Sequence, residues 1–216
     1  MKINKALKNC LDPAYPCIDF ECACVEMHKN REICNMPRGF CGGTGSLEEV
    51  ELVLVFSEPG DPYKGEKPND FESAYENTMN SFRNSEGQFH KNVRKILYSC
   101  WPSLSSDDKF DQIMRKVWLT ESVLCSAQIQ GGYVPVGVSR ACGCHYLSPQ
   151  LLLFPNALIV ALGSKPKNRL VDIGFCDFFP AGSAAPSGCN KHDAIESRNK
   201  IPLELQKHWQ GLLHQS

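Results

Sequence analysis

Short apolar runs alternate with amphipathic stretches from residue 50 to the end of the chain. Residues 51–56 (ELVLVF) are mostly apolar and β-branched, and the turn-rich sequence SEPGDP follows them. This pattern predicts a strand that ends at the rim of a sheet. Further strands are predicted at 117–120 (VWLT), 157–162 (ALIVAL) and 171–173, with 178–179 as a last edge.

Helical periodicity fills the intervals between these runs, at 70–83, 88–98, 107–115, about 147–153 and about 202–213. Alternating strands and helices predict a three-layer α/β/α fold around a mostly parallel, four-stranded sheet. Ligands in such folds bind beyond the carboxyl ends of the strands. The loops after Phe56, Thr120, Leu162 and Phe179 are therefore the candidate site, and the last opens with the small-residue run AGSAA.

Length and composition favour one domain over residues 1–216, with a cysteine-rich segment of about 1–45 packed on it. The formal net charge of −1 gives no global basic field, so any surface that binds DNA must be a local patch. The apolar stretch 151–162 is too short to span a bilayer, and MKINKALKNC contains no apolar signal core. We therefore expect a cytoplasmic monomer without a membrane partner.

Cysteine is the most unusual feature of the composition. The chain has twelve, and six of them fall within the first 41 residues: Cys10, Cys17, Cys22, Cys24, Cys34 and Cys41. Because disulfides are disfavoured in a reducing compartment, a cluster of thiols indicates metal ligation. Spacing alone does not separate zinc from an iron–sulfur cluster, and buried free thiols are the alternative.

Four segments follow one another in an informative order. ELVLVF leads to SEPGD, VWLT leads to ESVLC, then comes ACGCHYLSPQLLLFPNALIVALG, and a late loop reads FFPAGSAAPSGCN. In this order the chain resembles the uracil-DNA glycosylase superfamily, and within it the branch that carries an iron–sulfur cluster. The resemblance covers about residues 43–190 and is strongest over 142–163. It implies a DNA glycosylase of base excision repair, which hydrolyses the N-glycosidic bond of a flipped-out base.

The resemblance also implies a set of cluster ligands. Cys125 matches the third ligand of the family and Cys142 the fourth, with Cys144 as a competitor for the fourth place. The family's Cys-x-x-Cys pair is absent, so the first two ligands must come from Cys17, Cys22, Cys24 and Cys34, of which Cys34 and Cys24 are favoured. The expected cofactor is a 4Fe–4S cluster, with zinc as the alternative.

The first motif supplies candidate catalytic residues, Ser57 and Glu58, and candidate base-binding residues, Pro59 and Gly60. Pro59 and Gly60 match the family, Ser57 occupies a polar position of the motif, and Glu58 falls where other branches keep an Asp or Asn that activates water. A carboxylate suits this chemistry because it can position water and stabilise an oxocarbenium-like sugar. A lone Glu in a polar loop is, alternatively, simply solvated.

Base recognition is assigned to an aromatic ring. Phe71 lies about where the family places the ring that stacks on the flipped base. Two alternatives stay open: Phe71 is the first core residue of its helix, and Tyr63 stacks on the base instead.

Two motif positions depart from the family. Glu121 replaces the Asn that reads uracil, and an ionised carboxylate only accepts hydrogen bonds, whereas a protonated one also donates. Donation would require a pKa raised by burial. In the late loop, Ser187 matches the motif and is a candidate base-binding residue, whereas Ala185 replaces the His or Asn that stabilises the departing base, with His192 as a candidate substitute.

Three functions follow from these observations. The first is a glycosylase for uracil or for an altered specificity such as hypoxanthine or xanthine. The second is a protein with the glycosylase fold that binds nucleic acid or a nucleotide without cleaving it. The third is a zinc-stapled domain whose function lies elsewhere.

Overall fold

The computed structural model describes residues 4–15, 17, 37–61, 70–127, 131–186 and 188–214. These residues form a three-layer α/β/α arrangement around a five-stranded sheet, as expected except for one additional strand. Four strands run parallel, and the first is antiparallel to its neighbour. The sheet order is β1-β3-β2-β4-β5, with β1 at Cys41–Gly42, β2 at Leu52–Phe56, β3 at Val117–Glu121, β4 at Leu158–Leu162 and β5 at Phe179–Ala181. The additional strand β1 is only two residues long, which is too short for a readable pattern.

Helical segments connect consecutive parallel strands. Between β2 and β3 lie α4 (Phe71–Arg83), α5 (Gly87–Cys100) and α6 (Phe110–Lys116). Between β3 and β4 lie α7 (Val136–Cys142), a π-helical turn (Gly143–Leu147) and α8 (Ser148–Leu152). A single helix, α9 (Ser164–Asp172), connects β4 to β5. Outside the sheet connections are α1 (Lys5–Leu11), α10 (His192–Asn199) and α11 (Ile201–Leu213).

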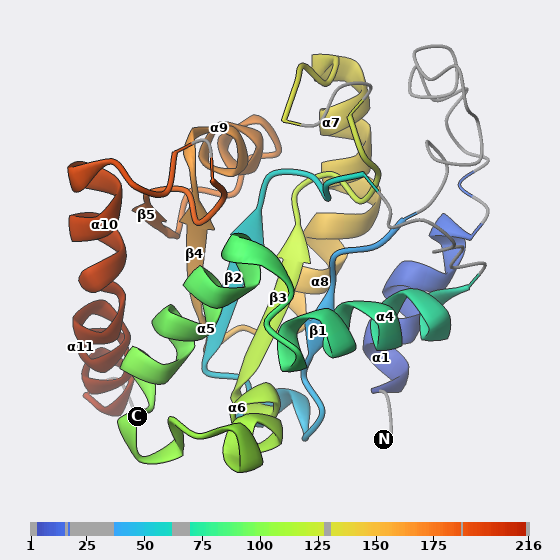
Figure 1. Ribbon diagram of the computed structural model, residues 1–216. Helices are drawn as coiled ribbons and strands as arrows, with labels where there is room; N and C mark the ends of the chain where they lie inside the picture. Colours follow the sequence, from blue (N-terminus) through green and yellow to red (C-terminus); the bar gives the residue numbers. More distant parts are fainter. Residues whose placement is uncertain are drawn as a thin grey trace.

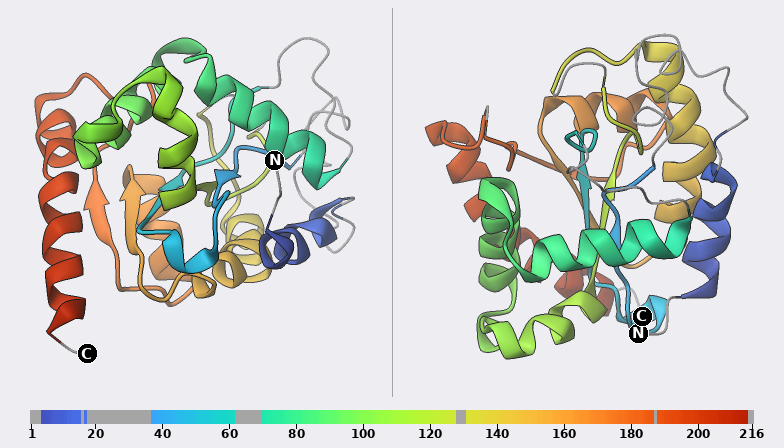
Figure 2. Two further views of the ribbon diagram at one scale, coloured as in Figure 1. Left: turned by 90° about the horizontal axis from the view of Figure 1, so that it is seen from below. Right: turned by 45° about the vertical axis from the view of Figure 1, so that its right-hand side comes forward.

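The helices cover both faces of the sheet (Figures 1 and 2). Helices α4, α5 and α6 lie on one face, and α7, α8 and α9 lie on the other, with α1 beside α8. Helices α10 and α11 close the edge at β5 and pack on α5. The carboxyl ends of the parallel strands therefore meet at the upper end of the sheet in Figure 1.

An aromatic layer fixes α4 against the sheet. Phe71 stacks on Phe40 with ring centroids 5.3 Å apart, and Tyr75 stacks on Trp118 at 6.4 Å. Asp70 caps the start of the helix, and its side chain accepts a hydrogen bond from the Ser73 backbone in a capping box. The same core cluster extends from Leu7 to Leu205, so the segments described share one hydrophobic core.

The prediction of a strand at 171–173 is wrong. These residues form the end of α9 and the residue that caps it. Pro166 is compatible with this helix because it lies in the first turn, where its missing N–H would have no helical partner. Leu170 is buried, whereas its neighbour Val171 is 51% exposed, so the short apolar run spreads over two faces of a helix.

No helix within the described ranges is long and apolar enough to cross a membrane.

Candidate functional site

A cavity of about 930 Å³ opens at the carboxyl ends of the parallel strands. The four loops singled out by the sequence all line it: residues 57–61 after β2, Glu121 at the end of β3, 163–165 after β4, and 183–186 with Gly188 after β5. Helix α5 and the end of α4 form another wall, and Arg38 and Gly39 complete the lining. The volume lies within the range of pockets that enclose a small ligand.

Glu121 is the carboxyl group at the floor of this cavity. It is the last residue of β3, pairs in register with Phe56 of β2, and is 4% exposed. Its Oε2 atom is buried and has no hydrogen-bond partner among the residues that the structure describes. Burial raises the pKa of Glu121 well above its ordinary value, and the negative charge of Glu58 adds to this effect. The charges of Arg169 and Arg38 oppose the shift without cancelling it.

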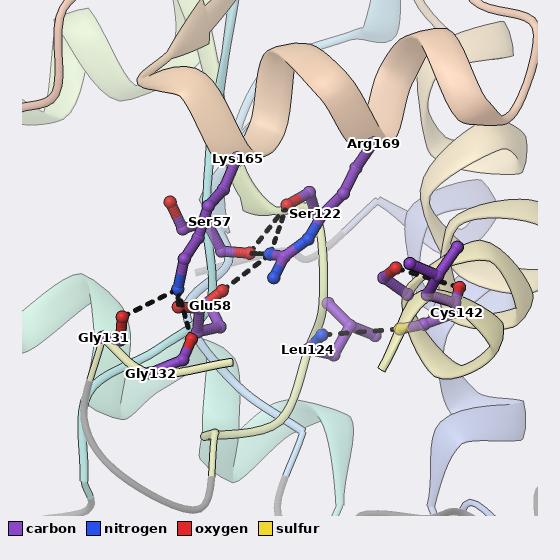
Figure 3. A network of polar contacts seen from close by, with 11 residues as sticks. Ser57, Glu58, Ser122, Leu124, Gly131, Gly132, Cys142, Lys165 and Arg169 are labelled. Carbon is purple, nitrogen blue, oxygen red and sulfur yellow. Dashed lines mark hydrogen bonds and ion pairs between the residues drawn. The ribbon is translucent and has the colours of Figure 1, made fainter. Parts of the chain in front are cut away.

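Glu58 has a contrasting environment (Figure 3). Its side chain is 3% exposed and lies between two cations of α9. Lys165 Nζ contacts Oε1, and Arg169 Nη1 lies 2.7 Å from Oε2 as an ion pair without hydrogen-bond alignment. The alternative that Glu58 is a solvated loop residue is therefore wrong, because both carboxylate oxygens face cations away from bulk water.

The same two cations hold the surrounding loops. Arg169 Nη1 donates hydrogen bonds to the carbonyl oxygen of Ser57 at 2.6 Å and to Ser122 Oγ at 3.0 Å. Lys165 Nζ donates to the carbonyl oxygens of Gly131 and Gly132, at 2.9 and 2.6 Å. Helix α9 thus fixes the loop after β2, the residues after β3 and residues 131–132 relative to one another (Figure 3).

Ser57, Pro59 and Gly60 lie where the sequence predicted, on the cavity wall. The Gly60 carbonyl oxygen accepts hydrogen bonds from the Arg38 guanidinium and, at 2.7 Å, from Ser126 Oγ. Arg38 itself is buried, and its backbone N–H donates to the Leu124 carbonyl oxygen at 2.9 Å. Arg38 therefore ties the segment before β1 to the first motif, a role that no sequence pattern indicated.

Side chains of α5 and α10 donate hydrogen bonds to the backbone of the late loop after β5. Asn92 Nδ2 donates to the Ala184 carbonyl oxygen at 2.9 Å, and the Arg198 guanidinium donates to the carbonyl oxygens of Ser183 and Cys189. Ala185 lies on the cavity wall and presents only a methyl group. Ser187, the motif residue predicted to contact the base, lies outside the described residues.

Two predicted site residues lie elsewhere. Phe71 is fully buried in the aromatic layer, so its alternative interpretation as a core residue is correct and it cannot stack on a base in the cavity. His192 is exposed at the start of α10 and does not contribute to the cavity that the described residues form. Tyr63, the other candidate for stacking, lies outside the described residues.

Two residues of α5 occupy the cavity wall in their place. Phe89 packs edge-on against Phe56, with ring centroids 5.0 Å apart. His90 Nδ1 donates to the Glu86 carbonyl oxygen, and burial lowers the pKa of its imidazole. Both lie within a helix predicted from the sequence, but helical periodicity does not indicate which of its residues face a cavity.

Of the predicted cluster ligands, Cys142 contacts the loop after β3 at the residue next to Cys125. Both cysteines are buried, and Cys142 Sγ accepts a hydrogen bond from the backbone N–H of Leu124, the neighbour of Cys125, at 3.5 Å. Cys144, the competitor for the fourth ligand, is exposed. This contrast favours Cys142 over Cys144.

A thiol of the N-terminal segment contacts the helical segment that follows Cys142. Tyr146, one helical turn after Cys142, donates its hydroxyl to Cys17 Sγ at 3.6 Å. Burial raises the pKa of Tyr15, and the electrostatic effect of nearby Cys125 adds to this shift.

The donor chemistry therefore fits a thiolate-bound metal group, although the described residues alone do not complete one. Within the described ranges, no group of three or more His, Cys, Asp or Glu side chains is arranged to hold a metal ion. Cys24 and Cys34, the predicted first two ligands, lie outside these ranges, as does Cys22.

Comparison with models of known protein families gives no match, and comparison with curated proteins gives none either.

Proposed function

We propose that the protein is a DNA glycosylase of the uracil-DNA glycosylase type, which binds a flipped-out base in the cavity and hydrolyses its N-glycosidic bond. The observation that carries this proposal is the buried carboxyl group of Glu121 on the cavity lining, whose Oε2 has no hydrogen-bond partner among the residues described. Its position at the carboxyl end of a central parallel strand is where α/β proteins bind their ligands.

A protonated, neutral Glu121 can form two hydrogen bonds with the edge of a base. The raised pKa keeps the carboxyl group protonated to higher pH than an exposed glutamate, and a protonated carboxyl has one O–H donor and one carbonyl acceptor. This pair complements a base that presents a carbonyl oxygen next to a ring N–H. Uracil, hypoxanthine and xanthine present such an edge, as do thymine and guanine, and the same carboxyl group turned over also complements the amino edge of cytosine or adenine, so rejection of undamaged bases rests on other features of the site. Glu121 thus replaces the family's amide without losing its donor and acceptor.

Stacking is assigned to Phe89, which is partly exposed on the cavity wall and braced by Phe56. A flipped base loses its neighbours in the duplex, and an aromatic face restores part of that stacking energy, about 1–3 kcal/mol per base.

We assign Glu58 to the water-attack step. Its carboxylate is bound by one buried cation, Arg169, and by one partly exposed cation, Lys165. Exchange of Lys165 for water opens Oε1 to the attacking nucleophile while Arg169 keeps the carboxylate in place. This arrangement positions water and sets a negative charge against an oxocarbenium-like sugar.

The cofactor proposed is a 4Fe–4S cluster, with zinc as the alternative. Cys125 and Cys142 would hold it, together with two thiols of the N-terminal segment, for which Cys17 is a candidate because it contacts Tyr146, four residues after Cys142. Its role is structural, because the pair of buried thiols joins α7 to the loop that follows β3. Soft thiolates suit either metal group, and visible absorption with sulfide analysis distinguishes them.

The test is a base-release assay on duplexes that carry uracil, hypoxanthine, xanthine or an alkylated base, with an undamaged duplex as the control. The proposal predicts an abasic site with at least one lactam-type base and none with the control. Absence of abasic sites with every duplex would reject it.

One observation favours a second function, binding without cleavage. Ala185 places a methyl group where the family keeps a side chain that hydrogen-bonds the departing base. Under this alternative the protein binds the damaged duplex more tightly than the control duplex but releases no base. The variant Ala185→His then gains base release, whereas under the first proposal it changes an activity that already exists.

A further inference from the structure

Two buried carboxyl groups of the cavity differ in the charges next to them. In the described part of the chain the Oε2 atoms of both lack a hydrogen-bond partner, but Glu58 forms ion pairs with Lys165 and Arg169, whereas Glu121 forms no ion pair there. Active sites that use two carboxyl groups for two roles separate them by environment in this way.

We infer that Glu121 is the general acid of the reaction and gives its proton to the departing base. This inference rests on the proposed function. It assigns to β3 the donor that the family's His or Asn supplies, since the side chain of Ala185 carries none.

The first argument is the placement of the group. Glu121 ends a central strand, lies beside Phe56 in the sheet and lines the cavity. A base that uses its lactam edge to contact Glu121 receives the hydrogen bond at a carbonyl oxygen, which is an atom that gains negative charge as the base leaves. A donor already in contact with that atom is in position to transfer its proton.

The second argument is the backbone opposite Glu121. Gly39 has φ 86°, and a Cβ at this position would lie 2.6 Å from Glu121 Cγ and 3.0 Å from Oε1. The glycine leaves room for the glutamate side chain, and the close fit restricts its freedom. A catalytic acid needs such restriction, because proton transfer depends on position.

The proposed reaction conserves atoms and electrons. The C1′–N bond breaks, its electron pair passes to the base, and the proton of Glu121 moves to the base oxygen. Water adds to C1′ and loses a proton, which returns through solvent to the Glu121 carboxylate. The products are a neutral base and an abasic sugar, and no oxidant or reductant is required.

Charged and titratable groups surround Glu121 from several elements. Glu58 follows β2, Arg38 precedes β1, Lys165 and Arg169 belong to α9, and His90 belongs to α5. Burial and Glu58 hold the proton on Glu121 in the resting state, whereas Arg38 and Arg169 stabilise the carboxylate that forms when the proton leaves. The site therefore favours a protonated Glu121 before the reaction and stabilises its carboxylate after the proton has left.

The experiment compares the wild type, Glu121→Gln and the control Glu76→Gln, whose side chain is exposed on α4. The amide keeps a donor and an acceptor but has no acidic proton. Single-turnover base release is measured from pH 5 to pH 10 on the duplex that the wild type cleaves, and binding of that duplex and thermal unfolding are measured in parallel. The inference predicts binding within about threefold of the wild type and base release lowered by about 100-fold or more in Glu121→Gln. It also predicts a wild-type rate that falls at high pH and a variant rate that lacks this fall.

Base release within about threefold of the wild type, or the same fall at high pH in both proteins, would overturn the inference. If Glu121→Gln does not fold, the wild-type profile still decides, because a rate that does not fall up to pH 10 contradicts an acid at this position. Failure of the proposed function is separate, since it appears in the wild type as no release from any duplex.

Discussion

Gly39 and Glu121 lie against each other so closely that neither position is independent of the other. The backbone of Gly39 adopts a left-handed φ of 86°, and a methyl group there would lie 2.6 Å from Glu121 Cγ. A contact this short never occurs between real atoms of the two types, so any larger residue at 39 must displace the glutamate. The glycine therefore sets the position of the group that, in our proposal, reads the base.

Gly39→Ala should lower both stability and base release. Overpacking in a buried site costs about 1–3 kcal/mol, and the left-handed backbone adds about 1 kcal/mol for a residue with a side chain. Chemical denaturation measures this effect. The matched control is Gly174→Ala, which has a similar φ of 79° and open space where the methyl group would lie. The control should lose only the backbone contribution and retain base release, and equal losses in both variants would contradict the close fit.

Glu121 should also make stability depend on pH. Its pKa is raised in the folded state, so above about pH 4.5 the native protein holds a proton that the unfolded chain has released. This contribution to stability is complete below that pH and is lost as the pH rises through the folded-state pKa, at about 1.4 kcal/mol per pH unit for one proton. Thermal unfolding from pH 5 to pH 10 should show a decline in the wild type that is smaller in Glu121→Gln. Parallel profiles would indicate that Glu121 titrates normally.

Much of this architecture was predictable because buried parallel strands produce short, continuous runs of apolar and β-branched residues in the sequence. The runs ELVLVF, VWLT and ALIVAL became β2, β3 and β4, and the loops after them line the cavity. Helix α9 was missed because SKPKNRLVD is mostly polar and its few apolar residues mimic a short strand.

The partners of site residues were not predictable. The loop sequence SEPG contains nothing to show that Glu58 lies between Lys165 and Arg169, more than a hundred residues later, because the crossover helix α9 brings them together. Periodicity likewise placed Phe71 in a helix, but it did not show whether the Phe71 side chain packs in the core or lines the cavity.

Removal of Arg169 should be strongly destabilising. In Arg169→Met, the buried Glu58 carboxylate keeps only Lys165, and the carbonyl oxygen of Ser57 loses a donor. Loss of one partner of a buried ion pair typically costs about 3–5 kcal/mol. The comparison is Arg83→Met, which removes the exposed pair with Asp111 and should cost at most about 1 kcal/mol. Urea denaturation of both variants measures the difference, and equal effects would mean that the Glu58 pair is solvated.

Cysteine substitutions should distinguish the thiols that bind the metal group from those that do not. If the buried pair holds a cluster, Cys125→Ser and Cys142→Ser should lose most of the iron, the sulfide and the visible absorption of anaerobically purified protein. Cys144→Ser and Cys176→Ser are the controls, because both side chains are exposed. Cys17→Ser tests whether the thiol next to Tyr146 is a ligand. Colourless wild-type protein that contains zinc would support the alternative metal, and loss of metal in Cys144→Ser would reassign the fourth ligand.

The central claim is that the cavity binds a lactam-type base and releases it from DNA. The most direct measurement is mass-spectrometric identification of the free bases that the wild type liberates from nitrous-acid-treated duplex DNA, a treatment that generates uracil, hypoxanthine and xanthine together. The account predicts that at least one of these bases is released, with release diminished in Glu121→Gln. Release of no base by the wild type, or equal release by the variant, would contradict it.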